Sequence, residues 1–581
     1  MSSNISVMEL DERSQSLVKH LSSAIVRTSS KAEIGTVQLA LQQLISALQQ
    51  GQTSVAISDA FSKKLLTQGI AGQANEFKAM IIDGNQLYLA RYYHYKNKLE
   101  TLLAKLSRQQ RSTFDSDKMQ PVLQRLFPLD PALQASGSGN WQKVAASLAL
   151  FQRFSVISGG PGTGKTTTVL KLLAALYEAQ EAGGRELQVM LAAPTGKAAA
   201  RMQESIRANI TPLPCADKIK QKLQALNAST LHRLLGYKHQ SVEFRHHAHN
   251  PLAVDILVVD ESSMIDSTMM SQLLDAIPAH ARIILLGDKD QLPPVGPGSP
   301  FVDICAQYGF SEPFAKQLAN LSGEDLSQVK ASHQPLSDNL VFLQHSFRFD
   351  AHSGIGNLAR AINNGDIDSA QTLLADETFS DIAWVDYAAS EYRKWDCANA
   401  DPIISKIKQG FGDYLQALKA RESFEAINEA FLHFCVLTCI RQGGSGLEKI
   451  NEIAQKALGF PSEQYWYHGR PIMISKNDYQ TKLYNGDVGL CLDLNGDGDL
   501  RVYFPTVEGH RAINTSRIPS HETAFTMTVH KSQGSEFKEV LFLLPEKLLP
   551  IINKQLVYTA ITRAKDRVEI WGSELRLYQQ D

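Results

Sequence analysis

The sequence predicts an α/β fold with two parallel-sheet domains covered by helices. β-rich runs alternate with helical segments in two separate parts of the chain, as strand–helix–strand units require. The expected strands are residues 154–158, 189–193, 255–259 and 282–286 in the first part, and 436–440, 539–544 and 568–571 in the second. At 581 residues the chain also exceeds what one hydrophobic core usually serves, which favours several domains.

The N-terminal part, residues 1–115, is expected to be a helical domain. Apolar residues recur at helical spacing in residues 37–45 and 99–106. The sequences FPLDP (127–131) and SGSG (136–139) are typical of turns and linkers. We therefore expect a linker at 116–138, a first α/β domain at 139–335 and a second at 336–581.

Residues 465–522 of the second domain are expected to form a small inserted β-barrel. Short strands at 471–475, 488–494 and 500–504 are joined by Asn-Gly-Asp sequences, which are typical of hairpin turns. Residues 493–498 also match the first half of a calcium loop. Position twelve of that loop is Phe504 instead of glutamate, so turns are the better interpretation.

Composition sets limits on partners and location. With 58 basic and 60 acidic residues the net charge is -2, so any nucleic-acid binding needs a local basic groove. The N-terminus has no apolar signal sequence and no segment reaches membrane-spanning length, so we expect a cytoplasmic protein without a membrane partner. Cys435 and Cys439 lie with His433 in an apolar run, where we interpret them as small apolar residues of a buried strand.

The segment GGPGTGKT at 159–166 matches the phosphate-loop pattern between an expected strand and an expected helix. Glycines let backbone N–H groups surround the β-phosphate, Lys165 reaches the β- and γ-phosphates, and Thr166 is a ligand for Mg²⁺. ATP and Mg²⁺ are therefore the expected cofactors. The nucleotide-binding residues expected here are Gly159, Gly160, Pro161, Gly162, Thr163, Gly164, Lys165, Thr166 and Thr167.

Two acidic residues and two arginines complete the expected chemistry. Asp260 and Glu261 end the buried strand at 255–259; Asp260 is placed to hold Mg²⁺ and Glu261 to orient and deprotonate the attacking water. Phosphoryl transfer also needs positive charge on the transferred group. Arg348 and Arg563 are candidate arginine fingers, because each lies in the second half of the chain and could act from the opposing domain.

An ordered series of motifs extends from residue 141 to 565. It contains GGPGTGKTT, APTGKAAARM, STLHRLLG, VVDESSMID, LLGDKDQLPPVGPG, HSFRF, TMTVHKSQGSEF and VYTAITRAK. This series resembles the motifs of superfamily 1 helicases. Three further segments, WQKVAASLAL, PIMISKNDYQTKLYNGDVG and LYLARYYHYKNKLE, resemble the RecD family, the alpha subunits of the bacterial RecBCD enzyme (exodeoxyribonuclease V).

The resemblance implies further roles. It implies RecA-like motor domains, an SH3-like inserted barrel, and an ATP-dependent helicase travelling 5′ to 3′. Partners would be RecB-like and RecC-like subunits in a heterotrimer that acts on single-stranded and double-stranded DNA ends in repair and recombination. Gln142 would contact adenine, Gln291 would sense the γ-phosphate, and Glu536 would lie near the ribose. The residues implied to line the single-strand track are Pro194, Thr195, Lys197, Thr230, His232, Thr528 and His530.

Several alternatives stay open on the sequence alone. Residues 236–251 could be a hairpin that splits the duplex or an ordinary surface loop. The chain could be a free-standing helicase, or a scaffold whose ATP site only stabilises assembly. We expect no nuclease domain in this chain, so nuclease activity would belong to the complex. Residues 1–115 lack a recognisable nucleic-acid module and are expected to dock partner subunits.

Overall fold

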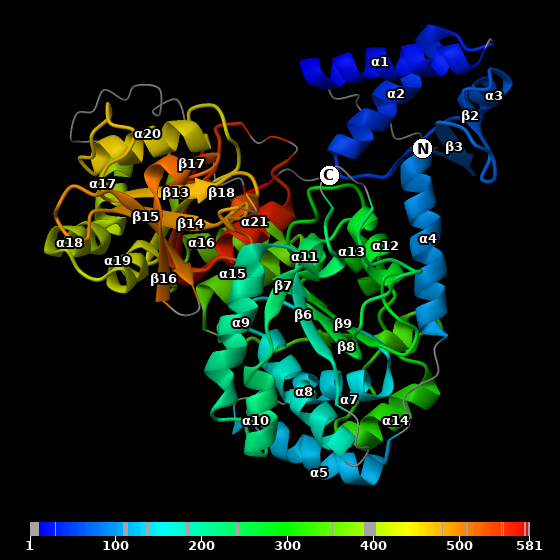
Figure 1. The fold of residues 1–581 in the computed structure, drawn as a ribbon, viewed down its shortest axis with the longest axis horizontal. Coiled ribbons are helices and arrows are strands. Elements are labelled where there is room, and N and C mark those ends of the chain that lie inside the picture. The colour runs from blue at the N-terminus through cyan, green and yellow to red at the C-terminus, as the bar shows by residue number, and fades with distance from the viewer. Residues whose placement is uncertain are drawn as a thin grey trace.

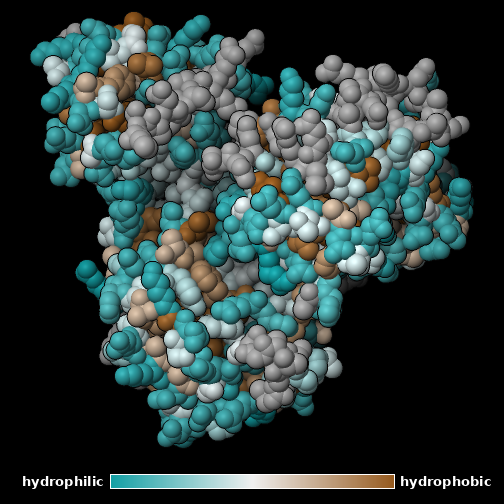
Figure 2. All heavy atoms as spheres, turned by 180° about the vertical axis from the view of Figure 1, so that it is seen from behind, coloured by the Kyte–Doolittle hydropathy of each residue, from teal (hydrophilic) through white to brown (hydrophobic). Residues whose placement is uncertain are grey.

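The computed structural model describes residues 11–29, 31–108, 114–128, 130–131, 133, 139–181, 186–238, 243–350, 352–387, 402–478, 480–506, 509–547, 549, 551–573 and 577–578. Figure 1 shows an N-terminal module in blue, a first α/β domain in cyan and green, and a second in yellow to red. On the face drawn in Figure 2 the surface is mainly hydrophilic, with apolar atoms in small groups. Among the described helices, none has the length and apolar character needed to cross a bilayer.

The first α/β domain has a six-stranded parallel sheet of order β10-β5-β9-β8-β6-β7. Its four expected strands are confirmed, and their residues are almost all buried, which explains their continuous apolar sequence. The strands are β5 (Phe154–Gly159), β6 (Val189–Ala193), β7 (Ala228–Thr230), β8 (Ile256–Val259), β9 (Arg282–Gly287) and β10 (Leu340–Leu343).

Helices cover both faces of this sheet, so successive strand residues enter different cores: Val156 packs in one and Ile157 in the other. The helices are α5 (Ser116–Leu126), α7 (Trp141–Phe151), α8 (Lys165–Glu181), α9 (Gly196–Ile210), α10 (Asp217–Gln224), α11 (Leu231–Leu235), α12 (Ser267–Asp275), α13 (Pro300–Cys305) and α14 (Glu312–Ser322). Between α11 and β8, His247 and Asn250 form an isolated bridge; residues 239–242 of the expected insertion at 236–251 lie outside the described residues.

The expected boundaries of this domain are wrong at both ends. β10 follows residue 335 but pairs with β5, with Leu340 opposite Val156. At the other end, residues 116–126 form helix α5 instead of a linker, and its Leu123 and Leu126 are fully buried in the domain core. The turn-like composition at 127–131 marks only where this helix ends.

The second α/β domain has a five-stranded parallel sheet of order β11-β20-β19-β12-β18. Its three expected strands are confirmed. The strands are β11 (Ile382–Asp386), β12 (Phe434–Thr438), β18 (Thr526–Thr528), β19 (Phe537–Leu543) and β20 (Ala564–Gly572); the helices are α15 (Gly354–Asn364), α16 (Ile367–Ala375), α17 (Pro402–Gly410), α18 (Gly412–Ala420), α19 (Phe424–Phe431), α20 (Leu447–Ala457) and α21 (Lys554–Ile561).

An antiparallel sheet of order β16-β15-β14-β13-β17 is inserted between α20 and β18. Its strands are β13 (Arg470–Ile474), β14 (Val488–Leu492), β15 (Arg501–Thr506), β16 (Gly509–Asn514) and β17 (His521–Thr523). The turn expected at 493–498 is confirmed, because the Asp493 carboxylate accepts hydrogen bonds from the N–H groups of Gly496 and Gly498. In the described pairings the two end strands, β16 and β17, do not join each other.

The N-terminal module is mostly helical, as expected, but residues 54–89 also contain strands that the sequence analysis did not predict. These residues contain a four-stranded sheet, β1-β4-β3-β2, and one helix. The strands have two to four residues, too few to show an alternating pattern. The elements are α1 (Glu12–Thr28), α2 (Ile34–Gln49), β1 (Ser54–Ala56), α3 (Asp59–Thr67), β2 (Ala71–Gly72), β3 (Met80–Asp83), β4 (Gln86–Leu89) and α4 (Ala90–Ser107).

Helix α4 joins this module to the first α/β domain. It runs beside α12 (Figure 1), and Leu99 and Leu106 are buried in the same core as Leu273. Lys98 of α4 also forms an ion pair of 2.9 Å with Asp275 at the end of α12. Helix α4 therefore belongs structurally to the first α/β domain as much as to the module.

Candidate active site

The phosphate loop connects β5 to α8. Gly162 and Gly164 have φ of +76° and +78°, a left-handed conformation that L side chains rarely adopt. The ammonium group of Lys165 lies inside the curve of the loop, where it donates to the carbonyl oxygens of Gly159 (2.6 Å) and Gly160 (3.2 Å). The loop is therefore formed, with its lysine at the centre.

The acidic pair follows β8, two strands away from β5 in the same sheet. Burial and the neighbouring Glu261 raise the pKa of Asp260 to about 6, although Lys165 opposes this. Glu261 has a φ of +50°, which is strained for a residue with a side chain. Its N–H donates to the Asp260 carboxylate at 2.8 Å. The fold thus holds two carboxylates together, and burial makes the charge of Asp260 unfavourable.

Arg348 lies where the chain passes from the first domain to the second, because Phe349, the next residue, is buried in the second-domain core. The Ser346 hydroxyl donates to the Pro161 carbonyl at 3.0 Å, and the Phe347 N–H donates to the Gly162 carbonyl at 2.9 Å. These bonds tie the backbone before Arg348 to the phosphate loop of the first domain. The reason is β10, which brings the chain to the same sheet edge as the loop after β5.

The Arg348 guanidinium instead reaches across to Glu536 of the second domain. The other carboxylate oxygen of Glu536 accepts from Arg201 of α9, and Lys565 lies 3.5 Å away. Burial alone would raise the pKa of Glu536, but Arg201 and Arg348 lower it to about 2. Both carboxylate oxygens of Glu536, the residue expected near the ribose, thus form ion pairs with arginines. Arg201 is a site residue that the sequence did not single out.

Arg563 comes from the second domain, as expected for an arginine acting across an interface. It follows α21 and is buried; its guanidinium donates to the carbonyl oxygens of Thr559 (3.1 Å) and Ser535 (3.2 Å). Burial lowers the pKa of Arg563, whereas Glu261 and Glu536 favour its charged form. Arg563 therefore lies within electrostatic reach of the acidic pair.

Gln142 contacts the phosphate loop directly, whereas Gln291 bonds to the turn after β9. Gln142, on α7, donates to the Thr163 carbonyl at 2.9 Å, and its amide lies against Gly164. Phe347 is 48% exposed beside the same glycine. Gln291 is buried and donates to the Asp288 carboxylate at 3.2 Å; its own side-chain oxygen has no hydrogen-bond partner among the described residues.

The candidate track residues lie where strands end. Pro194, Thr195 and Lys197 follow β6. Thr230 and Thr528 are the last residues of β7 and β18, and His232 and His530 lie two residues further along. The hydroxyls of Thr195 and Thr230 cap α9 and α11 by accepting from Ala198 and Arg233, respectively. Burial lowers the pKa of Lys197 to about 8 and also lowers the pKa values of both histidines. The inserted sheet reaches this region, since Tyr484 packs against Gly196.

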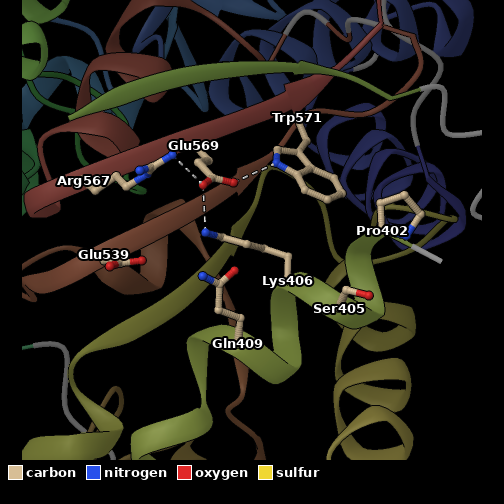
Figure 3. Close-up of a pocket in the computed structure, with 8 residues that line it drawn as sticks. All are labelled: Pro402, Ser405, Lys406, Gln409, Glu539, Arg567, Glu569 and Trp571. Carbon is tan, nitrogen blue, oxygen red and sulfur yellow. Dashed lines mark hydrogen bonds and ion pairs between the residues drawn. The ribbon is translucent and has the colours of Figure 1, made fainter. Parts of the chain in front are cut away.

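A cavity of about 460 Å³ lies elsewhere, between α17 and strands β19 and β20 of the second domain (Figure 3). Glu569 points into it and accepts from Lys406 (2.7 Å), Arg567 (3.1 Å) and Trp571 (3.3 Å). None of the expected site residues lines this cavity. Its central carboxylate is already paired with two cations, so we interpret the cluster as part of the packing of α17 on the sheet.

Two protein families match the parts of the chain that carry the site. Residues 142–297 match the family described as AAA domain, and residues 523–570 match the family described as UvrD-like helicase C-terminal domain. The first range contains the phosphate loop, the acidic pair and Gln291. The second contains Glu536 and Arg563. The two matches thus fall on the two sheets that face each other across the site.

Relatives extend the similarity over most of the chain. It is 37% identical to the RecBCD enzyme subunit RecD of Haemophilus influenzae over 86% of this chain and 78% of that protein. It is 35% identical to the subunit of the same name from Mycolicibacterium smegmatis, over 89% and 83%. It is 32% identical to the ATP-dependent RecD2 DNA helicase of Deinococcus radiodurans, over 72% and 47%. Since the matches to the RecD subunits span both sequences nearly throughout, this chain belongs to the RecD family of RecBCD enzyme subunits.

Proposed function

We propose that this chain is an ATP-dependent 5′–3′ DNA helicase and a subunit of a RecBCD-type helicase and nuclease complex. The complex would unwind double-stranded DNA ends for recombinational repair and for degradation of linear DNA. One observation carries the proposal: a formed phosphate loop and acidic pair in one domain face a buried arginine, Arg563, from another. Hydrolysis at such an interface can be coupled to domain movement, as a motor requires.

In this proposal the site hydrolyses ATP. Lys165 contacts the β- and γ-phosphates, Glu261 orients and deprotonates the attacking water, and Gln291 senses the γ-phosphate. Arg348 and Arg563 supply positive charge to the transferred group from the two sides of the cleft. For this, Arg348 leaves Glu536 and contacts phosphate instead. Glu536 keeps an ion pair with Arg201 through its other carboxylate oxygen, so its charge stays compensated.

The residues present fit a Mg²⁺ ion. Thr166 and Asp260 offer the oxygen ligands that Mg²⁺ prefers, and burial disfavours the charged form of Asp260, which a bound cation would stabilise. Bound there, Mg²⁺ would neutralise charge on the β- and γ-phosphate oxygens. The exposed ring of Phe347 and the amide of Gln142, which both lie beside Gly164, are proposed to contact the adenine base, with Glu536 near the ribose.

The single DNA strand is proposed to follow the strand ends of both domains. Hydroxyl, imidazole and ammonium groups there can contact phosphates without reading base identity, which suits a motor that must pass any sequence. The donors are Thr195, Lys197, Thr230, His232, Thr528 and His530, with Pro194 shaping the turn after β6. The inserted sheet is proposed to be the SH3-like domain of the family, and both parallel-sheet domains are proposed to be RecA-like.

The N-terminal module is proposed to dock RecB-like and RecC-like subunits. A free-standing 5′–3′ helicase is the alternative, favoured by the similarity to the RecD2 helicase; however, this chain spans only 47% of that protein. Purification of the tagged chain from its own cells separates the two, because only the first predicts two large partner subunits in fixed proportion.

Lys165→Gln tests the site directly. The variant should lose DNA-stimulated ATP hydrolysis and unwinding by at least about 100-fold, because it lacks the charge that stabilises the transferred phosphate. Circular dichroism and co-purification of partner subunits should stay unchanged, since the hydrogen bonds of Lys165 to described residues go to loop carbonyls. Lys218→Gln, at an exposed lysine of α10, is the matched control. Hydrolysis retained in Lys165→Gln would contradict the proposed site.

A further inference from the structure

The turn after β9 is held by the second domain at three points. The Tyr558 hydroxyl of α21 donates to the Asp288 carboxylate at 2.9 Å. The Leu292 N–H donates to the Thr559 hydroxyl at 2.9 Å, and the Gln533 amide donates to the Leu292 carbonyl at 3.3 Å. The Leu292 side chain, 2% exposed, packs in the hydrophobic core of the second domain.

Gln291 lies between these anchor points. Its amide donates to the same Asp288 oxygen, Oδ2, that accepts from Tyr558. The other oxygen of Asp288 accepts from the Asp290 N–H at 3.1 Å. With its amide group fixed in this way, Gln291 directs its side-chain oxygen elsewhere, and that oxygen is buried and unpartnered in the described structure. A buried acceptor without a donor is costly unless a ligand completes it.

Tyr558 also touches the phosphate loop. A methyl group on Gly160 would lie 3.0 Å from the Tyr558 hydroxyl oxygen. The hydroxyl thus lies between the loop that would hold the phosphates and the carboxylate that orients Gln291. The hydroxyl is held in this place by its ring, because Tyr558 is 4% exposed and the ring is packed in the second-domain core.

We propose that Tyr558 is a positioning residue for ATP hydrolysis. Its hydroxyl fixes Asp288, and Asp288 holds Gln291 so that its free oxygen can accept a hydrogen bond from the water that Glu261 deprotonates, through which Gln291 would sense the γ-phosphate. The arrangement forms only when α21 is seated against the first domain, so Gln291 is competent only in the closed cleft. This inference rests on the proposed function, because it assigns Gln291 to the hydrolytic step.

Tyr558→Phe is the test, because it removes one oxygen atom and keeps the packed ring. The kcat of single-strand-stimulated ATP hydrolysis should fall about 10- to 100-fold, as expected for misplacement of a catalytic group. The KM for ATP should stay within about threefold, because Tyr558 takes no part in ground-state nucleotide binding. Tyr578→Phe is the matched control: its hydroxyl is buried in the same core without a hydrogen-bond partner in the described structure, so kcat should be unchanged.

A second substitution distinguishes action through Gln291 from a general structural effect. Gln291→Ala should lower kcat, and adding Tyr558→Phe to it should change kcat by less than about twofold, because the residue on which Tyr558 acts is gone. Multiplicative losses in the double variant, or a Tyr558→Phe variant no slower than Tyr578→Phe, would overturn the inference. Lys165→Gln in the same assay reports separately on the proposed function, since its failure to abolish hydrolysis would remove the site itself.

Discussion

Two glycines with the same backbone conformation show what the site demands of single residues. Gly162 in the phosphate loop and Gly365 after α15 have φ of +76° and +72°. A side chain at Gly365 would meet nothing within 4 Å, whereas one at Gly162 would collide with Arg348 and Ser346. A residue with a side chain would therefore have a strained backbone at both positions, but only at Gly162 would it also clash with neighbouring residues.

Alanine at these two positions should separate stability from function. Each substitution should destabilise the protein by about 1–2 kcal/mol through the left-handed backbone. Gly162→Ala should in addition displace the segment that carries Arg348, so ATP hydrolysis should fall by about tenfold or more while Gly365→Ala keeps its activity. Thermal unfolding and steady-state hydrolysis measure the two effects. Equal activity in both variants would show that Gly162 contributes only its φ angle.

Glu536 should stabilise the contact between the two domains in a pH-dependent way. Its pKa is about 2 in the folded protein and near 4.5 in the unfolded chain. A folded-state pKa below the unfolded value means that the stabilisation is complete above about pH 5 and declines as pH falls from 4.5 towards 2. At pH 7 we expect a contribution of about 2 kcal/mol, reduced by the partial exposure of Arg201.

Glu536→Gln should therefore lower the thermal unfolding midpoint at pH 7, and the difference from the natural protein should shrink as the pH is lowered to about 3. Glu463→Gln, at an exposed glutamate, is the control and should change little at either pH. A destabilisation of Glu536→Gln that is the same at pH 7 and pH 3 would mean that the ion pairs to Arg201 and Arg348 are not its source.

How much of the site can be predicted from the sequence depends on how far apart along the chain the interacting residues lie. The phosphate loop and the acidic pair are each contained in a few consecutive residues, so their pattern is visible without a fold. Arg201 and Tyr558 were missed because their partners, Glu536 and Asp288, lie 335 and 270 residues away (from the numbers 201 and 536, 288 and 558). A local sequence pattern cannot indicate contacts between residues so far apart in the chain.

At the scale of elements, burial decides what the sequence predicts. The central strands of both parallel sheets are covered on both faces, so they form continuous apolar runs that were correctly predicted. The N-terminal strands were missed because they are short, although the Asp83-Gly84-Asn85 turn between β3 and β4 carried a hairpin signal. Helix α5 was not predicted, because the sequence that follows it has the composition of a linker.

Helix α4 sets where the N-terminal module can be cut. Removal of residues 1–89 keeps Leu99 and Leu106 in the core of the first domain, whereas removal of residues 1–107 takes both away. The longer deletion should destabilise that domain by several kcal/mol, since each buried leucine contributes about 2–5 kcal/mol. Both deletions should abolish capture of partner subunits, but only the shorter one should retain the ATP hydrolysis of the isolated chain. Partner capture that survives the shorter deletion would place the docking surface elsewhere.

At the scale of the whole molecule, the site is assembled from two sheets that separate segments of the chain build. Loops after β5, β8 and β9 supply the phosphate loop, the acidic pair and Gln291, and α21 with the loop before β19 supplies Arg563 and Glu536. The sequence predicts this division through the order of its motifs. It could not predict that Leu292 is buried in the core of the other domain, because that contact exists only once both domains are folded.

Because of the path of β10, the two arginines are attached differently to the two domains. Arg348 lies between Ser346 and Phe347, which bond to the phosphate loop, and Phe349, which is buried in the second-domain core, while Arg563 is embedded in the second domain. When the two domains separate, Arg563 would move away from the bound product nucleotide with the second domain, while Arg348 would stay beside the phosphate loop. The two arginines would therefore release the product one after the other, Arg563 before Arg348.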